Sequence, residues 1–177
     1  MKKKPIYLWI LLVLSALISA SSLFGILGPV PSKEALRASL SNSGSLTAQQ
    51  IEDTVNYTYQ VTVSSHSIFN VLLIALSAIL VVVAFVFLVR KNVQFANYAY
   101  LGYLLLAIVG LVYSFMNIQD AVQLIKDDTL GLGIGTLAKG TVILFMIINV
   151  LFLALVFYKM WRQQKDLAEE AEAEEVA

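Results

Sequence analysis

Four long runs of apolar residues constrain the fold of this chain more than any other feature. Each run lacks Asp, Glu, Lys, Arg and His, and each is long enough to cross a bilayer as a helix, which takes about 17 to 25 residues. Backbone amides in hydrocarbon must be satisfied within their own segment, so these runs are helices rather than strands. The predicted spans are residues 5–30, 68–89, 96–116 and 141–158.

The composition agrees with this membrane interpretation. Of the 177 residues, 59% are hydrophobic and only 14% are charged, whereas soluble domains carry about 25% charged residues. The sequence therefore predicts an all-α membrane protein, a four-transmembrane-helix antiparallel bundle with short amphipathic helices in its first outer loop, residues 31–66. We expect two parts: an integral membrane domain over residues 1–165 and an acidic cytoplasmic tail over residues 166–177.

The distribution of basic residues predicts the orientation of the chain. If the chain crosses the membrane four times, most of its basic residues fall on one side, and basic residues near span ends stay in the cytoplasm. We therefore expect a cell-membrane protein with both termini and the turn after the second span in the cytoplasm. The residues on this side are Lys2, Lys3, Lys4, Arg90, Lys91, Lys159, Arg162 and Lys165.

The first span also has features of a cleavable signal peptide. A basic segment precedes it, and Ala20 and Ser22 are small residues suited to a cleavage site. The apolar stretch extends to about 25 residues, however, which exceeds the 7 to 15 of a signal-peptide core. We therefore expect a retained helix; cleavage would leave three spans with the remaining topology unchanged.

The first outer loop carries signals of two short helices. Ser32 precedes a segment in which Leu36 and Leu40 lie four residues apart on one face. Thr47 and Gln50 then have the spacing of a capping box. We expect these helices to form a small outer cap. Their apolar faces would cover the end of the bundle or, in the alternative interpretation, receive a partner.

The second outer loop contains the stretch LGLGIGTLAKGTV, which resembles a phosphate-binding loop. In such a loop the lysine follows the last glycine, because it must reach the terminal phosphates. Lys139 instead precedes Gly140, so we expect no nucleotide site. The sequence predicts an interfacial helix around Ile118 to Ile125, a flexible glycine-rich connection, and a last helix starting at Gly140. The glycines of this connection are Gly131, Gly133 and Gly135.

Small and polar residues within the spans are candidates for helix packing. An amide in hydrocarbon seeks a hydrogen-bonding group on another helix, so Asn149 is expected to join helices or, alternatively, to contact a substrate. Small side chains allow close approach of helix backbones where lipid offers no hydrophobic driving force. The small-residue candidates are Ser15, Ser19 and Ser22 in the first span and Gly102, Gly110 and Ser114 in the third.

Two further residues are candidates for ligand binding or pH sensing. Tyr103 lies deeper in the third span, where we expect it to form a hydrogen bond within the bundle or, in the alternative interpretation, to line an aromatic ligand site. His66 is the only histidine. One histidine cannot form a metal site without carboxylate help, and no nucleophile with base and acid is assembled around it. We therefore predict no catalytic residue, metal or cofactor.

The predicted function is that of a non-enzymatic accessory, regulatory or assembly subunit of a membrane complex. The spans hold no ionisable side chain of the kind that proton-coupled transporters use. The expected partners are the lipid bilayer and another membrane protein or a second copy, with no nucleic acid and no nucleotide. The alternatives are a permease-type transporter component working with a separate ATPase or as an oligomer, and an immunity or envelope-stress protection protein.

Overall fold

The computed structural model describes residues 5–42 and 46–175, and its described part is all-helical, without strands. Four of the six helices are long and apolar enough to cross a membrane: α1, α4, α5 and α6. The helices are α1 (Ile6–Leu27), α2 (Lys33–Ser41), α3 (Ala48–Ser65), α4 (Ile68–Val89), α5 (Val93–Val122) and α6 (Asp128–Glu175). Three of the basic residues used to predict orientation, Lys2 to Lys4, lie outside the described residues.

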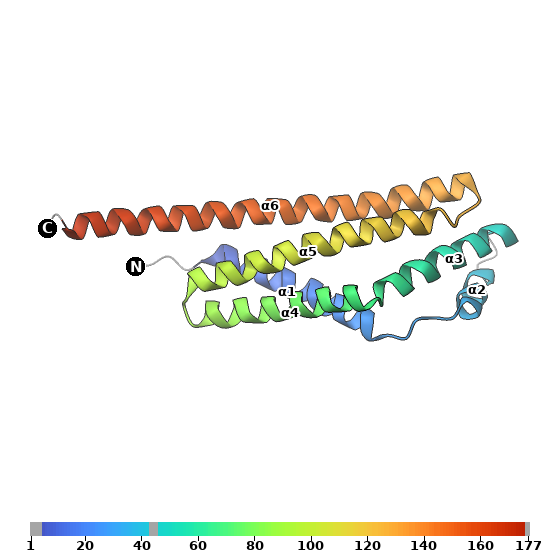
Figure 1. The fold of residues 1–177 in the computed structure, drawn as a ribbon, viewed down its shortest axis with the longest axis horizontal. Coiled ribbons are helices and arrows are strands. Elements are labelled where there is room, and N and C mark those ends of the chain that lie inside the picture. The colour runs from blue at the N-terminus through green and yellow to red at the C-terminus, as the bar shows by residue number, and fades with distance from the viewer. Residues whose placement is uncertain (1–4, 43–45, 176–177) are drawn as a thin grey trace.

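The long helices pack in chain order. Helix α1 packs on α4, α4 on α5 and α5 on α6. The start of α1, the far end of α6 and the α4–α5 turn lie at one end of the molecule, which we call the terminal end (Figure 1). Helices α2 and α3 and the α5–α6 turn lie at the opposite end, which we call the cap end (Figure 1).

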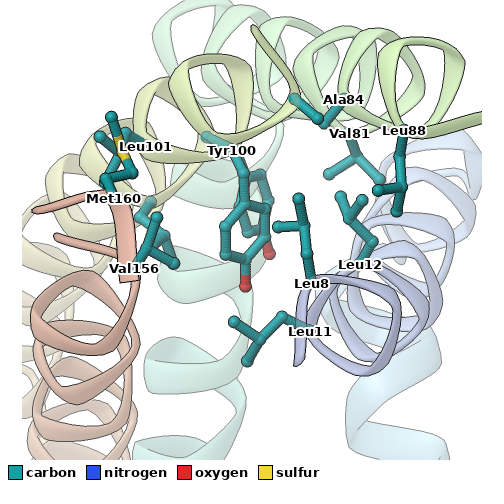
Figure 2. Close-up of a cluster of buried hydrophobic side chains, with 13 residues drawn as sticks. Leu8, Leu11, Leu12, Val81, Ala84, Leu88, Tyr100, Leu101, Val156 and Met160 are labelled. Carbon is teal, nitrogen blue, oxygen red and sulfur yellow. The ribbon is translucent and has the colours of Figure 1, made fainter. Parts of the chain in front are cut away.

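The main hydrophobic core lies toward the terminal end. Figure 2 shows Tyr100 of α5 between the leucines of α1 and Val156 of α6. This cluster holds α1 and α6 to the central α4–α5 hairpin. Its buried members are Leu8, Leu11, Leu12, Val81, Ala84, Leu88, Ala96, Tyr100, Leu101, Tyr103, Leu104, Val156 and Met160.

Local hydrogen bonds fix the starts of the cap-end helices. The side chain of Ser32 accepts from Ala35 N–H, and Thr47 and Gln50 form the complete capping box that the sequence predicts. Both helix starts are thereby confirmed. Helix α2 packs on α3 but has no buried residue. The apolar face expected at Leu36 and Leu40 is therefore only half-covered.

The connection between the third and fourth long helices differs from the predicted one. Helix α5 continues as a single helix to Val122, and α6 already begins at Asp128, so the predicted flexible glycine connection is wrong. A Cβ added to Gly135 would lie 3.2 Å from a methyl of Val122, and one added to Gly131 would lie 3.5 Å from Ile125. These two glycines share one helix face and let α6 approach the end of α5 closely.

Candidate functional site

A cavity of about 310 Å³ lies among α1, α4, α5 and α6, on the cap-end side of the core. This volume is at the lower end of the range of small-molecule sites, roughly 300 to 1,000 Å³. The apolar part of its wall consists of Ile18, Leu73, Ile74, Leu106, Ala107, Gly110, Leu111 and Phe145. Uncharged polar side chains interrupt this wall: Ser19, Ser22, Asn70, Ser77, Tyr103, Ser114 and Asn149.

Several of these polar groups have no hydrogen-bond partner. Tyr103 is 4% exposed and Ser19 is 8% exposed, and no partner exists for either hydroxyl among the described residues. No fully buried side-chain oxygen or nitrogen lacks a partner in the described part of the chain. The Tyr103 hydroxyl must therefore border the open space of the cavity. Ser77 and Ser114 are half-buried and likewise have no partner among the described residues.

Two side-chain amides on the wall use their nitrogen but not their oxygen in a hydrogen bond among the described residues. The Nδ2 atom of Asn149 donates to the carbonyl oxygen of Phe145, 2.8 Å away, and Nδ2 of Asn70 donates to the carbonyl of Ser65, 2.7 Å away. Neither carbonyl oxygen Oδ1 accepts a hydrogen bond within the described residues. The cavity thus combines free acceptors on amides with hydroxyls that both donate and accept.

The cavity opens sideways between α1 and α6. Ile18 on α1 and Phe145 on α6 both line it, yet they are 51% and 43% exposed. At the terminal end, Tyr100 of α5 lies between these two helices (Figure 2), and α1 and α6 do not pack along each other. A molecule would therefore enter through the surface that faces lipid if the four long helices span a membrane.

One of the lining residues, Tyr103, is stacked on a second tyrosine that lies outside the cavity lining. The rings of Tyr100 and Tyr103 stack with centroids 5.6 Å apart. Tyr100 is fully buried, and its hydroxyl lies 3.1 Å from Ser15 Oγ in a hydrogen bond between α5 and α1. Ser15 therefore fixes Tyr100, while Tyr103 forms part of the wall.

A second polar network joins three helices at the terminal end. The Tyr7 hydroxyl donates to Asn97 Oδ1 at 3.0 Å, and Asn97 Nδ2 donates to Gln163 Oε1 at 3.4 Å. The ammonium of Lys159 lies 5.8 Å from the centre of the Tyr7 ring. Asn97 is fully buried, so this chain of bonds satisfies its amide and links α1, α5 and α6.

At the cap end, α3 holds the α5–α6 turn through Asp53, which is 1% exposed. Its Oδ2 accepts from the backbone N–H groups of Lys126 and Asp127 at 2.9 and 3.0 Å, and its Oδ1 accepts from Gln49 Nε2 at 2.8 Å. Asp127 in turn caps α6 by accepting from Leu130 N–H and also accepts from Gln50 Nε2. These hydrogen bonds, led by that of Leu130, lower the pKa of Asp127 below its ordinary value.

Two of the packing candidates make no close contact with another helix among the described residues of this chain. The amide of Asn149 donates to the preceding turn of α6. A Cβ added to Gly110 would meet no atom within 4 Å, and packing of either residue against a helix of a second chain stays a prediction. Both residues lie on the cavity wall instead, together with Ser19, Ser22 and Ser114.

The other predicted site residues lie away from the cavity. A Cβ added to Gly102 would lie 3.2 Å from Leu80 Cδ1, so Gly102 is at the α4–α5 contact. His66 lies at the α3–α4 junction, with Nε2 3.0 Å from the carbonyl oxygen of Gly28 and Nδ1 2.9 Å from that of Thr62. Both ring nitrogens of His66 therefore face backbone carbonyl oxygens.

Sequence reasoning missed the residues whose partners are distant in the chain. Asp53 binds a turn that lies 73 and 74 residues away, and Asn97 and Gln163 are 66 residues apart. Nothing in the local pattern of the sequence indicates such pairs. Ser77 also lines the cavity, and the only available signal was a hydroxyl within an otherwise apolar span.

The stretch that resembles a phosphate-binding loop is helical from Leu130 to Val142, so its glycines do not form a loop around an anion. Among the described residues, no group of three or more His, Asp or Glu side chains is arranged to hold a metal ion. No curated protein and no solved structure matches this chain. The model of one family matches residues 1–169, and the chain therefore belongs to the family described as "Domain of unknown function (DUF8777)".

Proposed function

We propose that this protein is a non-enzymatic, multi-pass protein of the cell membrane that acts as an accessory, regulatory or assembly subunit of a membrane complex. In this proposal the terminal end faces the cytoplasm. Arg90 and Lys91 at the α4–α5 turn, and Lys159 and Arg162 on α6, support that orientation, because basic residues near span ends stay inside.

The observation that carries the proposal is the length of α6. Its 48 residues extend roughly 72 Å at 1.5 Å per residue, whereas the hydrocarbon core of a bilayer is only about 30 Å thick. The helix continues beyond the start of α1 and the α4–α5 turn at the terminal end (Figure 1). A continuous helix of this kind would connect the membrane domain rigidly to a docking segment in the cytoplasm.

The sequence of this extension suits a protein partner. Six acidic residues lie within its last stretch, whereas the basic residues lie nearer to the apolar span. Such a segment is repelled by the anionic inner surface of a membrane and attracted by a basic protein surface. We therefore place the docking segment at residues 166–177, the predicted acidic tail.

Copurification tests the accessory role. The full chain and a variant that ends at Lys165 would be isolated in mild detergent and analysed by quantitative mass spectrometry. We expect one membrane protein in stoichiometric amount with the full chain, and its loss with the shortened chain. A control variant with the six acidic residues changed to glutamine keeps the length of the helix and should also lose the partner. Recovery of the chain alone in both cases would contradict the proposal.

A transporter component is the second candidate function, and the cavity among the four long helices favours it. Its uncharged polar wall would suit a neutral substrate, and four helices from one chain would require a second copy or a separate ATPase. Flux of a neutral solute into liposomes that contain only this protein would support transport. Absence of flux together with a stoichiometric partner would favour the accessory role.

A further inference from the structure

We propose that the cavity among α1, α4, α5 and α6 binds an uncharged amphiphile, a molecule with an alkyl chain and a hydroxyl-bearing polar head such as a monoacylglycerol. This inference concerns the protein by itself and does not rest on the accessory role. It follows from the partnerless hydroxyls, the neutral wall and the sideways opening.

The polar groups of the wall define the head of the ligand. Tyr103 is nine-tenths buried, lines the cavity and has no hydrogen-bond partner among the described residues. Its hydroxyl borders the open space of the cavity, so a ligand that fills this space must supply a hydrogen bond to it, because a hydroxyl covered without a partner costs free energy. Asn149 and Asn70 each present an amide oxygen that accepts no hydrogen bond among the described residues. A ligand with hydroxyl groups both donates and accepts, so it satisfies both kinds of group.

The charge of the ligand follows from the lining residues. The cavity is lined by no Asp, Glu, Lys, Arg or His in the part of the chain that the structure describes. An ion brought from water into such a site would lose its hydration without gaining a counter-ion. The wall therefore selects an uncharged head over a carboxylate or a phosphate.

The alkyl chain follows from the opening. Ile18 and Phe145 are exposed where the cavity reaches the surface between α1 and α6. Both belong to helices apolar enough to cross a membrane, so a ligand arrives from the lipid phase. A cavity of about 310 Å³ accommodates a small head and the first part of a chain, while the rest of the chain lies outside against these two helices.

Photolabelling in lipid nanodiscs tests this inference. The purified full-length protein in phosphatidylcholine nanodiscs would be labelled with a monoacylglycerol that carries a diazirine on its alkyl chain. We expect saturable labelling of peptides from α1 and α6. Unlabelled monooleoylglycerol should compete. The oleate anion should not compete because it is charged, and hexadecane should not compete because it has no polar head.

Matched variants connect the labelling to the cavity. Tyr103→Phe should weaken binding about 3- to 10-fold, as expected for the loss of one hydrogen bond. The control is Tyr113→Phe, because the Tyr113 hydroxyl bonds to Ser67 Oγ at 2.8 Å and does not line the cavity. Gly110→Leu should abolish saturable labelling, because Gly110 lines the cavity and a Cβ added there meets no atom within 4 Å, so the leucine side chain would extend into the cavity.

Three results would overturn the inference. The first is labelling that does not saturate, which would mean that only bulk lipid occupies the cavity. The second is equal competition by hexadecane or oleate, because the polar wall would then play no part in selection. The third is wild-type labelling of both Tyr103→Phe and Gly110→Leu, provided that both variants elute as the wild type does in gel filtration.

Discussion

Asp53 is the residue that most directly holds the cap to the long helices. Its buried carboxylate accepts three N–H groups, two of which belong to the α5–α6 turn. In Asp53→Asn, one oxygen becomes an NH₂ group and faces a donor. We expect the free energy of unfolding to fall by about 1.5 to 3 kcal/mol, the contribution typical of hydrogen bonds to a charged group. Denaturant titration in detergent micelles measures this change.

The control for Asp53 is an exposed aspartate. Asp120 lies on the exposed side of α5, and Asp120→Asn should change the free energy of unfolding by no more than about 0.5 kcal/mol. Equal losses in the two variants would show that general charge, rather than the bonds of Asp53, stabilises the cap end.

The lowered pKa of Asp127 predicts how stability at the cap end depends on pH. Hydrogen bonds from Leu130 N–H and Gln50 stabilise its carboxylate and lower its pKa. A group whose pKa is lower in the folded state stabilises the fold above its unfolded pKa, about 4 for aspartate, and this contribution is lost as the pH falls further. Asp127→Asn retains a helix-capping oxygen but does not titrate.

Unfolding measurements between pH 7 and pH 3 check this linkage. We expect the wild type to be more stable than Asp127→Asn at pH 7, and this advantage to shrink as the pH falls below about 4. Because all other carboxyl groups are common to both proteins, the difference between their free energies of unfolding reports the titration of Asp127 alone. A difference that is constant across this range would be inconsistent with a lowered pKa.

At the scale of the elements, the contact between α5 and α6 depends on the face that each glycine occupies. Gly135 lies against Val122, whereas a Cβ added to Gly133 meets nothing within 4 Å. Gly135→Leu should lower the free energy of unfolding by about 1 to 3 kcal/mol through overpacking. Gly133→Leu should raise it by up to about 1 kcal/mol, since leucine is the better helix former. Unfolding of the two variants in the same detergent compares them.

The outcome of this pair distinguishes a helix from a flexible connection. If residues 130–140 formed a loop, leucine at either position would have a similar effect. Opposite signs follow only when the two positions lie on different faces of one helix. The comparison therefore tests the correction that the structure makes to the sequence prediction.

The elements differ in how far sequence could predict them. The starts of α2 and α3 depend on neighbouring residues, such as Thr47 and Gln50, and local reasoning located them. The start of α6 was missed because Gly131, Gly133 and Gly135 favour a turn by themselves, whereas in the structure Gly131 lies against Ile125 and Gly135 against Val122, contacts that the sequence does not reveal. The cavity was missed because it, too, depends on how helices pack against one another. Its wall comes from four helices, and their spacing does not follow from any one of them.

At the scale of the whole molecule, the arrangement of the long helices makes the predicted topology testable. Thr129 lies at the start of α6 near the cap end, and Asn92 lies in the α4–α5 turn at the terminal end. Both residues are exposed, and the chain has no cysteine of its own. Single cysteines at these two positions therefore report the two ends of the molecule separately.

A membrane-impermeant maleimide added to intact cells gives the measurement. Because Arg90 and Lys91 lie in the α4–α5 turn, the positive-inside rule predicts a cytoplasmic position for that turn. We expect Thr129→Cys to be labelled from outside, and Asn92→Cys to be labelled only after the membrane is permeabilised. The reverse pattern would invert the orientation and place the acidic tail outside, where a cytoplasmic partner could not reach it. Labelling of both positions in intact cells would contradict an arrangement in which α5 separates the two ends across a membrane.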